Sequence, residues 1–269
     1  MKKKFIKLSL VIISFIIIFT LVNKDKSLNV MKYNHKDISW ITECPIAHRG
    51  LHNSVAPENS IPAFYRAIEK GYPIELDVRL TKDNKVVVIH DSNLERLTKD
   101  KRKVENITYS ELSKLQLLGT KEKVPLFKDV LKLVDGKVGL LIEIKSCENI
   151  DKLLENANTT LEKYKGKYAI QSFDKRVIEW YEENNTKAIK GMLVKNQSAL
   201  NYINKESIED SNNISNVDFI SASLAIVDNA QIQYFRSQGL KVLSWTIKNT
   251  KGLEKARKYS DNYIFENID

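Results

Sequence analysis

Four short stretches of the sequence concentrate ionisable side chains at the ends of apolar, β-branched runs. They read Ala47-His48-Arg49-Gly50, Glu75-Leu76-Asp77, His90-Asp91 and Glu143-Ile144-Lys145. In the second and fourth stretches one residue separates the two charged residues, so on a strand both would project from the same face. Burying such charges without partners is costly. Three carboxylates gathered at one place therefore indicate a site for a hard divalent cation, which prefers oxygen ligands.

Taken singly, each stretch has an ordinary structural explanation. A lone Glu-x-Asp is more often a solvated strand face, and a lone Glu-x-Lys is usually a structural ion pair. A His-Arg pair at a strand end fits a capped core histidine equally well. The combination is different, because all four stretches fall at predicted carboxyl ends of strands, where barrel enzymes keep their active sites. We therefore interpret the four stretches as one site.

The elements that position these residues alternate between short β-branched runs and amphipathic helical patterns. Strand-like runs cover residues 46–49, 74–78, 86–90, 139–145, 168–172, 189–194, 219–221, 241–247 and 263–265. Helical patterns cover residues 60–70, 127–134, 150–164, 175–183 and 230–238, with Ser60 as an N-cap and Gly71 and Gly239 as stops. The alternation predicts a parallel sheet. So many units within residues 45–269 favour a closed TIM (β/α)8 barrel over an open sheet.

Nine strand-like runs are one too many for such a barrel, and the surplus has a local explanation. Val78 and Val86 are too close in sequence for a parallel crossover, which needs about a dozen residues. The segment ELDVRLTKDNKVVVIHD instead predicts an antiparallel hairpin that turns at Asp83-Asn84. A two-residue loop would place Asp77 opposite His90 on one face. We expect an extra hairpin strand beside the second barrel strand.

Composition limits the class of protein. The chain has 269 residues, of which 42% are hydrophobic, enough for one full-sized domain and unlike a disulfide mini-protein, a fibre or a disordered tail. Its net charge is +9, but the first 26 residues carry +5 of this. The remaining +4 is spread over charges of mixed sign. We therefore expect no nucleic-acid partner.

The amino terminus predicts a membrane anchor. Residues 8–22 read LSLVIISFIIIFTLV after a lysine-rich start, and residues 5–22 are just long enough to cross a bilayer. A cleaved secretory signal is the alternative, but no A-x-A-like cleavage site follows. Either reading places the domain outside the cytoplasm. We expect an uncleaved signal anchor at residues 1–26, a linker at 27–44 and the barrel domain at 45–269.

Cys44 and Cys147 are the only cysteines, and in an exported protein they could form a disulfide. The predicted barrel sends them to opposite ends, so we expect no bridge. Of the two remaining histidines, we expect His52 to lie in solvent on a loop, and we assign no role to His35.

The stretch from Ile46 to Thr98, IAHRGLHNS through SNLERLT, closely resembles the opening of the glycerophosphodiester phosphodiesterase family, within the phospholipase C-like phosphodiesterase superfamily. The resemblance continues at LLIEIK, IQSFD and LSWTIKN and covers nearly all of residues 45–249. It implies a TIM barrel that hydrolyses glycerophosphodiesters to glycerol 3-phosphate and an alcohol. It also implies one divalent metal ion, Ca²⁺ or Mg²⁺.

The resemblance also implies individual roles. The metal ligands are Glu75, Asp77 and Glu143, the catalytic residues are His48 and His90, and the substrate contacts are Arg49, Glu58, Lys145 and Trp245. The family commonly ends its last strand with an acidic Thr-Asp-type motif, whereas this chain reads Tyr263-Ile264-Phe265-Glu266-Asn267. We expect the last barrel strand to form, with different residues at its carboxyl end than the family commonly has there.

The residue types suit this chemistry. A phosphodiester gains negative charge in its transition state, which an arginine fork and a lysine can stabilise. Two histidines with ordinary pKa values of about 6.5 can accept and donate the protons. Water and the glycerol 2-hydroxyl are both candidate nucleophiles. Alternatives are the same chemistry on a glycerol-phosphate cell-wall polymer or a lysophospholipid, and a non-catalytic binding barrel, which is disfavoured because no catalytic residue is missing.

Overall fold

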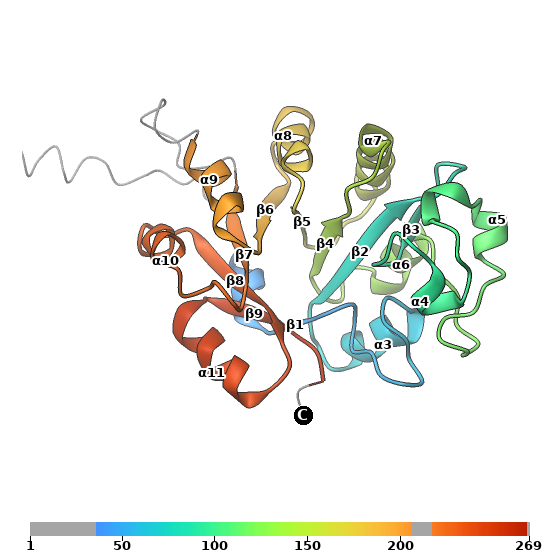
Figure 1. Ribbon diagram of the computed structural model, residues 1–269, viewed down its shortest axis with the longest axis horizontal. Helices are drawn as coiled ribbons and strands as arrows, with labels where there is room; N and C mark the ends of the chain where they lie inside the picture. The colour runs from blue at the N-terminus through green and yellow to red at the C-terminus, as the bar shows by residue number, and fades with distance from the viewer. Residues whose placement is uncertain (1–35, 206–216, 268–269) are drawn as a thin grey trace, which may run out of the picture. The chain divides into compact units, whose positions relative to one another are not determined.

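Eight parallel strands close into a barrel in the computed structural model, which describes residues 36–205 and 217–267 (Figure 1). The strands are β1 (Ile46–Ala47), β2 (Ile74–Leu80), β4 (Leu140–Ile144), β5 (Tyr168–Ser172), β6 (Ile189–Val194), β7 (Phe219–Ser223), β8 (Lys241–Ile247) and β9 (Asn262–Phe265). The ring closes because β1 pairs in parallel with both β2 and β9. The predicted TIM barrel is confirmed.

Amphipathic helices cover the outside of the barrel. They are α3 (Ile61–Glu69), α6 (Phe127–Val134), α7 (Ile150–Leu161), α8 (Lys175–Asn184), α9 (Gln197–Lys205), α10 (Ala230–Ser237) and α11 (Thr250–Tyr259). The Ser60 side chain accepts a hydrogen bond from the Ala63 N–H, as expected of an N-cap. Gly71 and Gly239 have φ values of 72° and 98°, the left-handed conformation that ends a helix. The sequence did not predict α9 and α11.

The extra strand β3 (Val86–Val88) pairs antiparallel with β2, which confirms the hairpin. The predicted register of this hairpin was wrong by one residue. Val78 pairs with Val88, and Asp77 therefore lies opposite Ile89 and not opposite His90. The turn has three residues rather than two, since the Thr81 N–H donates to the Lys85 carbonyl and Asn84 takes a φ of 58°. A left-handed last residue is usual in three-residue hairpin loops. As a result, His90 lies in a bend beyond the end of β3.

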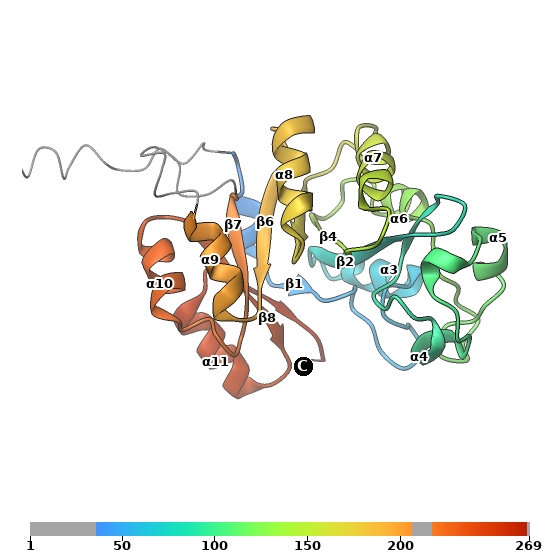
Figure 2. The same ribbon diagram turned by 45° about the horizontal axis from the view of Figure 1, so that its top comes forward.

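After β3 the chain makes an excursion outside the barrel, beside β2 and α3 (Figure 2). It contains three single-turn helices, α4 (Glu95–Thr98), the 3-10 helix η1 (Val104–Asn106) and α5 (Tyr109–Leu112). Val87, Ile89 and Leu94 belong to a small apolar cluster of its own that supports this excursion. The excursion holds His90 and its neighbours at the barrel mouth.

The bottom of the barrel is closed by a short helix, α2 (Ser39–Glu43). Its Trp40 and Ile41 are buried in the cluster that fills the lower barrel. The Asn262 amide donates 2.6 Å hydrogen bonds to the carbonyls of Ile41 and Cys44. The linker expected at residues 27–44 therefore ends earlier, because residues 39–44 pack on the barrel to cover its apolar lower end.

The two cysteines lie next to different barrel strands. Cys44 precedes β1 and Cys147 follows β4, and both are free thiols.

The anchor expected at residues 1–26 lies outside the described residues. Within residues 36–205 and 217–267, no helix is long and apolar enough to cross a membrane.

Candidate active site

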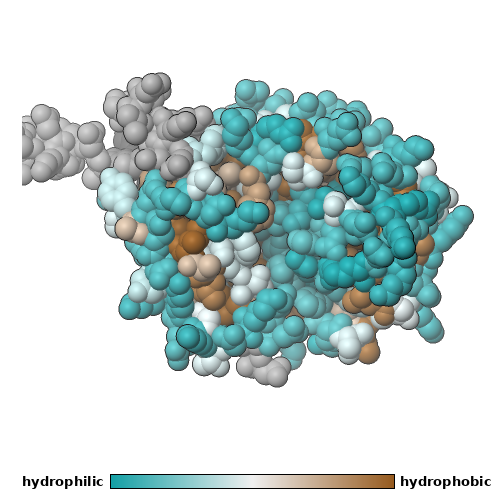
Figure 3. All heavy atoms as spheres, viewed as in Figure 1, coloured by the Kyte–Doolittle hydropathy of each residue, from teal (hydrophilic) through white to brown (hydrophobic). Residues whose placement is uncertain are grey.

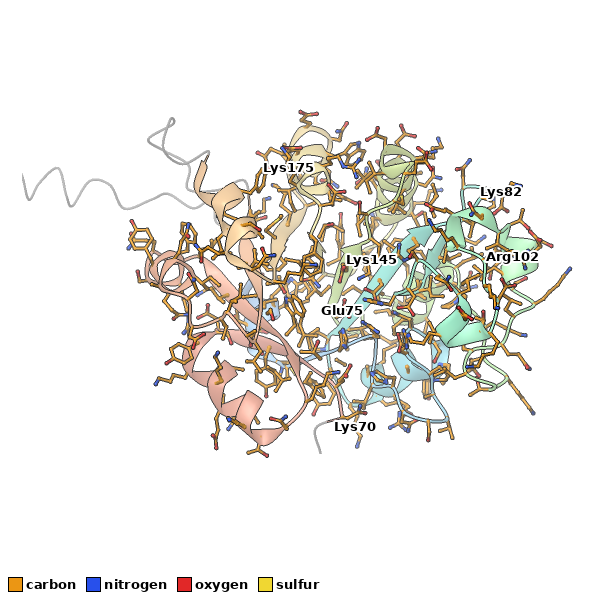
Figure 4. The ribbon with its side chains drawn as sticks, viewed as in Figure 1. Lys70, Glu75, Lys82, Arg102, Lys145 and Lys175 are labelled. Carbon is orange, nitrogen blue, oxygen red and sulfur yellow. The ribbon has the colours of Figure 1, made fainter. Side chains whose placement is uncertain are left out.

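Three carboxylates converge at the carboxyl end of the barrel, as predicted. Glu75 and Asp77 lie on one face of β2, and Glu143 lies beside Asp77 on β4 in the register of the sheet. Their exposed fractions are 1%, 1% and 7%, and ligand oxygens of all three lie within 4.8 Å of one another. Figure 4 shows Glu75 near the centre of the ring of strands. The three can therefore share one ion.

The electrostatics of this cluster also favour a cation. Burial, together with repulsion from Asp77 and Glu143, raises the pKa of Glu75 well above its ordinary value. Burial and repulsion from Asp77 raise the pKa of Glu143 to about 7. Burial opposes ionisation of Asp77 too, but Lys145, His90 and Arg49 outweigh it and hold its pKa far below the ordinary value. With all three carboxylates ionised, their negative charge would exceed the positive charge of Arg49 and Lys145, so a bound cation would favour the ionised form of both glutamates.

The donor set fits a hard divalent cation. Glu75, Asp77 and Glu143 supply only oxygen atoms, which Ca²⁺ and Mg²⁺ prefer. The Oδ1 atom of Asp77 is buried and accepts no hydrogen bond with good geometry, although Lys145 Nζ lies 2.9 Å away. An ion shared by the three carboxylates would satisfy this atom and relieve their repulsion.

Two cations face the carboxylates. Lys145 projects from the same face of β4 as Glu143, and its Nζ lies 2.5 Å from Glu143 Oε1 (Figure 4). The Arg49 N–H donates to Glu75 Oε2 at 3.0 Å, and Arg49 Nε lies 3.4 Å from Asp77 Oδ2. Both side chains are placed to contact an anion bound at the carboxylate cluster.

Backbone geometry holds Arg49 in this position. Arg49 and Gly50 both have positive φ, 54° and 77°, in the turn directly after β1. A Cβ on Gly50 would lie 2.8 Å from the Ala63 carbonyl carbon, closer than real contacts allow. The turn therefore requires glycine, because it packs directly on the first turn of α3.

Each predicted catalytic histidine has a carboxylate partner. His48 Nδ1 lies 2.6 Å from Glu266 Oε2, and His90 Nδ1 lies 2.7 Å from Asp91 Oδ1. Burial lowers the pKa of both imidazoles below 6.5, and the Glu266 hydrogen bond partly opposes this for His48. A neutral histidine that donates Nδ1–H to a carboxylate keeps a lone pair on Nε2. Both histidines can therefore exchange protons through Nε2.

Glu266 is a site residue that the sequence prediction missed. It follows β9, whose carboxyl end we expected to differ from the family's, and it also pairs with Lys248. His52 Nε2 is buried and lies 3.6 Å from Glu266 Oε2, so the expectation that His52 lies in solvent was wrong. The available signal was an acidic residue directly after the last strand, at the position of the family's acidic motif.

Arg96 and Asn59 were also missed. Arg96 donates to both oxygens of Glu58 and to Asp91 Oδ2, so it joins the loop after β1 to the excursion after β3. Asn59 donates to Asp77 Oδ2 at 2.8 Å. Glu58, which we expected to contact the substrate, accepts hydrogen bonds from Arg49 and Arg96 and reaches the site through Arg49.

Trp245 lies on the opposite, more apolar side of the mouth. Its Nε1 donates to the Ser221 carbonyl at 2.9 Å, and its ring lies 5.6 Å from that of Phe173. Phe173 is 39% exposed and adds apolar surface beside Trp245. In Figure 3 the surface is hollowed near its centre, with hydrophobic atoms on the side of β7 and β8 and hydrophilic atoms on the side of β2. The mouth therefore has a charged half and an apolar half.

Known proteins resemble this chain in sequence and in fold. The family model described as the glycerophosphoryl diester phosphodiesterase family matches residues 48–266. YhdW of Bacillus subtilis (strain 168), a glycerophosphodiester phosphodiesterase by name, is 31% identical over 232 residues, covering 78% of this chain and 88% of its own.

Two solved structures have the same barrel. One is the glycerophosphodiester phosphodiesterase of Thermotoga maritima, with a TM-score of 0.68 and 26% identity over 83% of this chain and 94% of its own. The other is a phosphodiesterase of Oleispira antarctica in complex with the product sn-glycerol-3-phosphate. It has a TM-score of 0.72 and 21% identity over 82% of this chain and 91% of its own. With the family match spanning the whole site, the chain belongs to the glycerophosphoryl diester phosphodiesterase family.

Proposed function

We propose that the protein uses one divalent cation to cleave glycerophosphodiesters into glycerol 3-phosphate and an alcohol. The observation that carries this proposal is the convergence of Glu75, Asp77 and Glu143 within 4.8 Å, beside two carboxylate-held histidines. The Oleispira antarctica relative, with its bound sn-glycerol-3-phosphate, supports glycerol 3-phosphate as the product.

The three carboxylates would hold the cation, which when bound polarises a phosphoryl oxygen and orients the diester. Their oxygen-only donor set suits Ca²⁺ and Mg²⁺ alike. Arg49 and Lys145 face the same point and stabilise the negative charge that the phosphoryl group gains in the transition state. Glu58 accepts a hydrogen bond from Arg49 and so holds the guanidinium in this position.

His48 and His90 carry the protons. One Nε2 accepts a proton from the nucleophile, and the other, when protonated, donates one to the leaving oxygen. Both assignments of acid and base fit the geometry, because each imidazole is held in the same way at Nδ1. Water and the glycerol 2-hydroxyl both remain candidate nucleophiles.

Hydrolysis and metal dependence are tested together on the full-length chain. We expect release of glycerol 3-phosphate from glycerophosphoglycerol, loss of activity with a chelator, and recovery with Ca²⁺ or Mg²⁺. A panel with a glycerol-phosphate polymer and a lysophospholipid separates the alternative substrates. Activity that survives both chelation and His48→Ala would reject the proposed mechanism.

We also propose that residues 5–22 anchor the protein with its catalytic domain outside the cytoplasm, on the strength of the lysine-flanked apolar run. Protease added to intact cells should then digest the domain while a cytoplasmic marker stays intact. Recovery of the chain in the membrane fraction distinguishes an uncleaved anchor from a secreted form. Digestion that requires cell lysis contradicts the outward orientation.

A further inference from the structure

Arg79 is a half-buried cation beside the active site that forms no ion pair with a described residue. It lies on β2 two residues beyond Asp77, on the same face of the strand. Its Nε donates to the His90 carbonyl at 2.8 Å. Within the described ranges Arg79 forms no salt bridge, whereas Arg49, Arg96 and Lys145 each pair with carboxylates. Asp77, Glu143 and Asp91 act on Arg79 through their charge, but none of them forms an ion pair with it, so its guanidinium can still bind an anion.

A broad, open cavity of about 610 Å³ at the surface is lined in part by Arg79. Its lining residues are Arg79, His90, Asp91, Ser92, Asn93, Glu95 and Arg96. The Asp91 carboxylate already pairs with His90 and Arg96, and the Glu95 side chain is exposed at the rim. The volume suits a small ligand group. Because His90 forms part of the wall, whatever enters the cavity lies directly beside the reacting centre.

The cavity lies next to the proposed diester site, because neighbouring strands carry Arg79 and Lys145. The Lys145 N–H donates to the Val78 carbonyl, so Lys145 and Arg79 lie at one level on neighbouring strands. Neighbouring strands are about 4.8 Å apart. A phosphoryl group at Lys145 and a second anionic group at Arg79 can therefore belong to one molecule in which a single glycerol separates them.

We propose that Arg79 and this cavity form a subsite for a second phosphate, carried by the alcohol portion of the substrate. The guanidinium presents a planar fork of donors that matches phosphate oxygens. Ser92 adds a neutral hydroxyl group to the lining, whereas the Asn93 amide already bonds to the backbone of Glu95 and Lys101. The inference rests on the proposed function and narrows it to glycerophosphodiesters whose alcohol is phosphorylated.

Two substrates that differ only in the second phosphate test the subsite. They are glycerophosphoglycerol and the same diester with a phosphate on its terminal glycerol, both assayed with the full-length chain. We expect the wild type to have a kcat/KM about tenfold or more higher for the phosphorylated diester, since a charge-assisted hydrogen bond is of this strength. Arg79→Gln should abolish the preference, and Arg79→Lys should retain part of it.

The ratio of the two kcat/KM values is the readout, because Arg79 also contacts the His90 carbonyl and its loss can slow both reactions. Arg102→Gln is the matched control, since Arg102 is an arginine of the same excursion that does not line the cavity; its ratio should equal that of the wild type. Equal losses on both substrates, or an unchanged ratio, overturn the subsite alone. Failure of the wild type to cleave either diester rejects the proposed function.

Discussion

Glu75→Gln is expected to lower kcat/KM for a glycerophosphodiester by about 10³-fold, because a charged ligand of the cation is lost. The glutamine amide oxygen can still accept the hydrogen bond that the Arg49 N–H donates to Glu75. The loss should therefore appear as weakened metal affinity and slow turnover rather than as a displaced Arg49. A glycerol 3-phosphate assay over a metal titration measures both.

The same substitution should leave the metal-free protein as stable as the wild type or make it more stable. Burial and repulsion raise the pKa of Glu75 above its ordinary value, 4.5. A group with a raised folded-state pKa contributes stability at low pH that is lost as pH rises. The stability advantage of Glu75→Gln over the wild type should consequently grow between about pH 5 and pH 8.

Asp77→Asn is the matched comparison, with the opposite sign. Lys145 and Arg49 keep the pKa of Asp77 far below 3.8 against the effect of burial, so its ionised form stabilises the fold at neutral pH. Its removal should cost about 3 kcal/mol, because two partly buried cations lose a partner. Urea unfolding at pH 5 and pH 8, with and without Ca²⁺ or Mg²⁺, tests both variants. If Glu75→Gln were destabilised as much as Asp77→Asn without metal, the carboxylates would not form a strained cation site.

Glu266→Gln is expected to lower kcat by about 10³-fold, in line with the loss of a carboxylate that holds a catalytic imidazole in the correct tautomer. The hydrogen bond from His48, with the nearby side chains of His52 and Lys248, holds the pKa of Glu266 well below its ordinary value, so it is ionised throughout the assay range. A glutamine amide can donate to Nδ1 and so move the His48 proton to Nε2. His48 could then no longer accept a proton there.

A pH profile distinguishes this positioning role from a merely structural one. Glu266 raises the pKa of His48 against the lowering effect of burial. In Glu266→Gln the part of the profile that reports His48 should therefore move to lower pH, and Glu266→Asp should restore part of the activity. Lys248→Gln is the control, because Lys248 is 61% exposed and its pair with Glu266 should matter little. A reduced rate with an unshifted profile in Glu266→Gln would contradict the role.

The barrel and the convergence of the three carboxylates could be predicted from the sequence because both rest on local patterns. Helix α6 and strands β5, β6 and β8 begin and end at the residues that the hydrophobic pattern of the sequence predicts. The Glu-x-Asp and Glu-x-Lys spacings fix which side chains share a strand face, and parallel strands bring their carboxyl ends together. Glu75, Asp77 and Glu143 therefore converge whatever the loops do.

The loops were less predictable, because their conformation depends on single residues. One extra turn residue shifted the β2–β3 register, and a bend rather than strand pairing brings His90 to the mouth. The linker expected to be irregular instead closes the barrel, because its Trp40 and Ile41 find an apolar lower end to cover. Such choices are decided by packing between distant parts of the chain.

The sequence by itself determined the barrel, the family and the charged residues of the candidate site, since all of these follow from residue type and spacing. Only the tertiary structure decided which partner each charge has. Glu266 is 218 residues away from His48, and Arg96 is 38 away from Glu58, so no local pattern could pair them. The same holds for Arg79, whose lack of an ion pair among the described residues depends on every side chain that the fold brings near it.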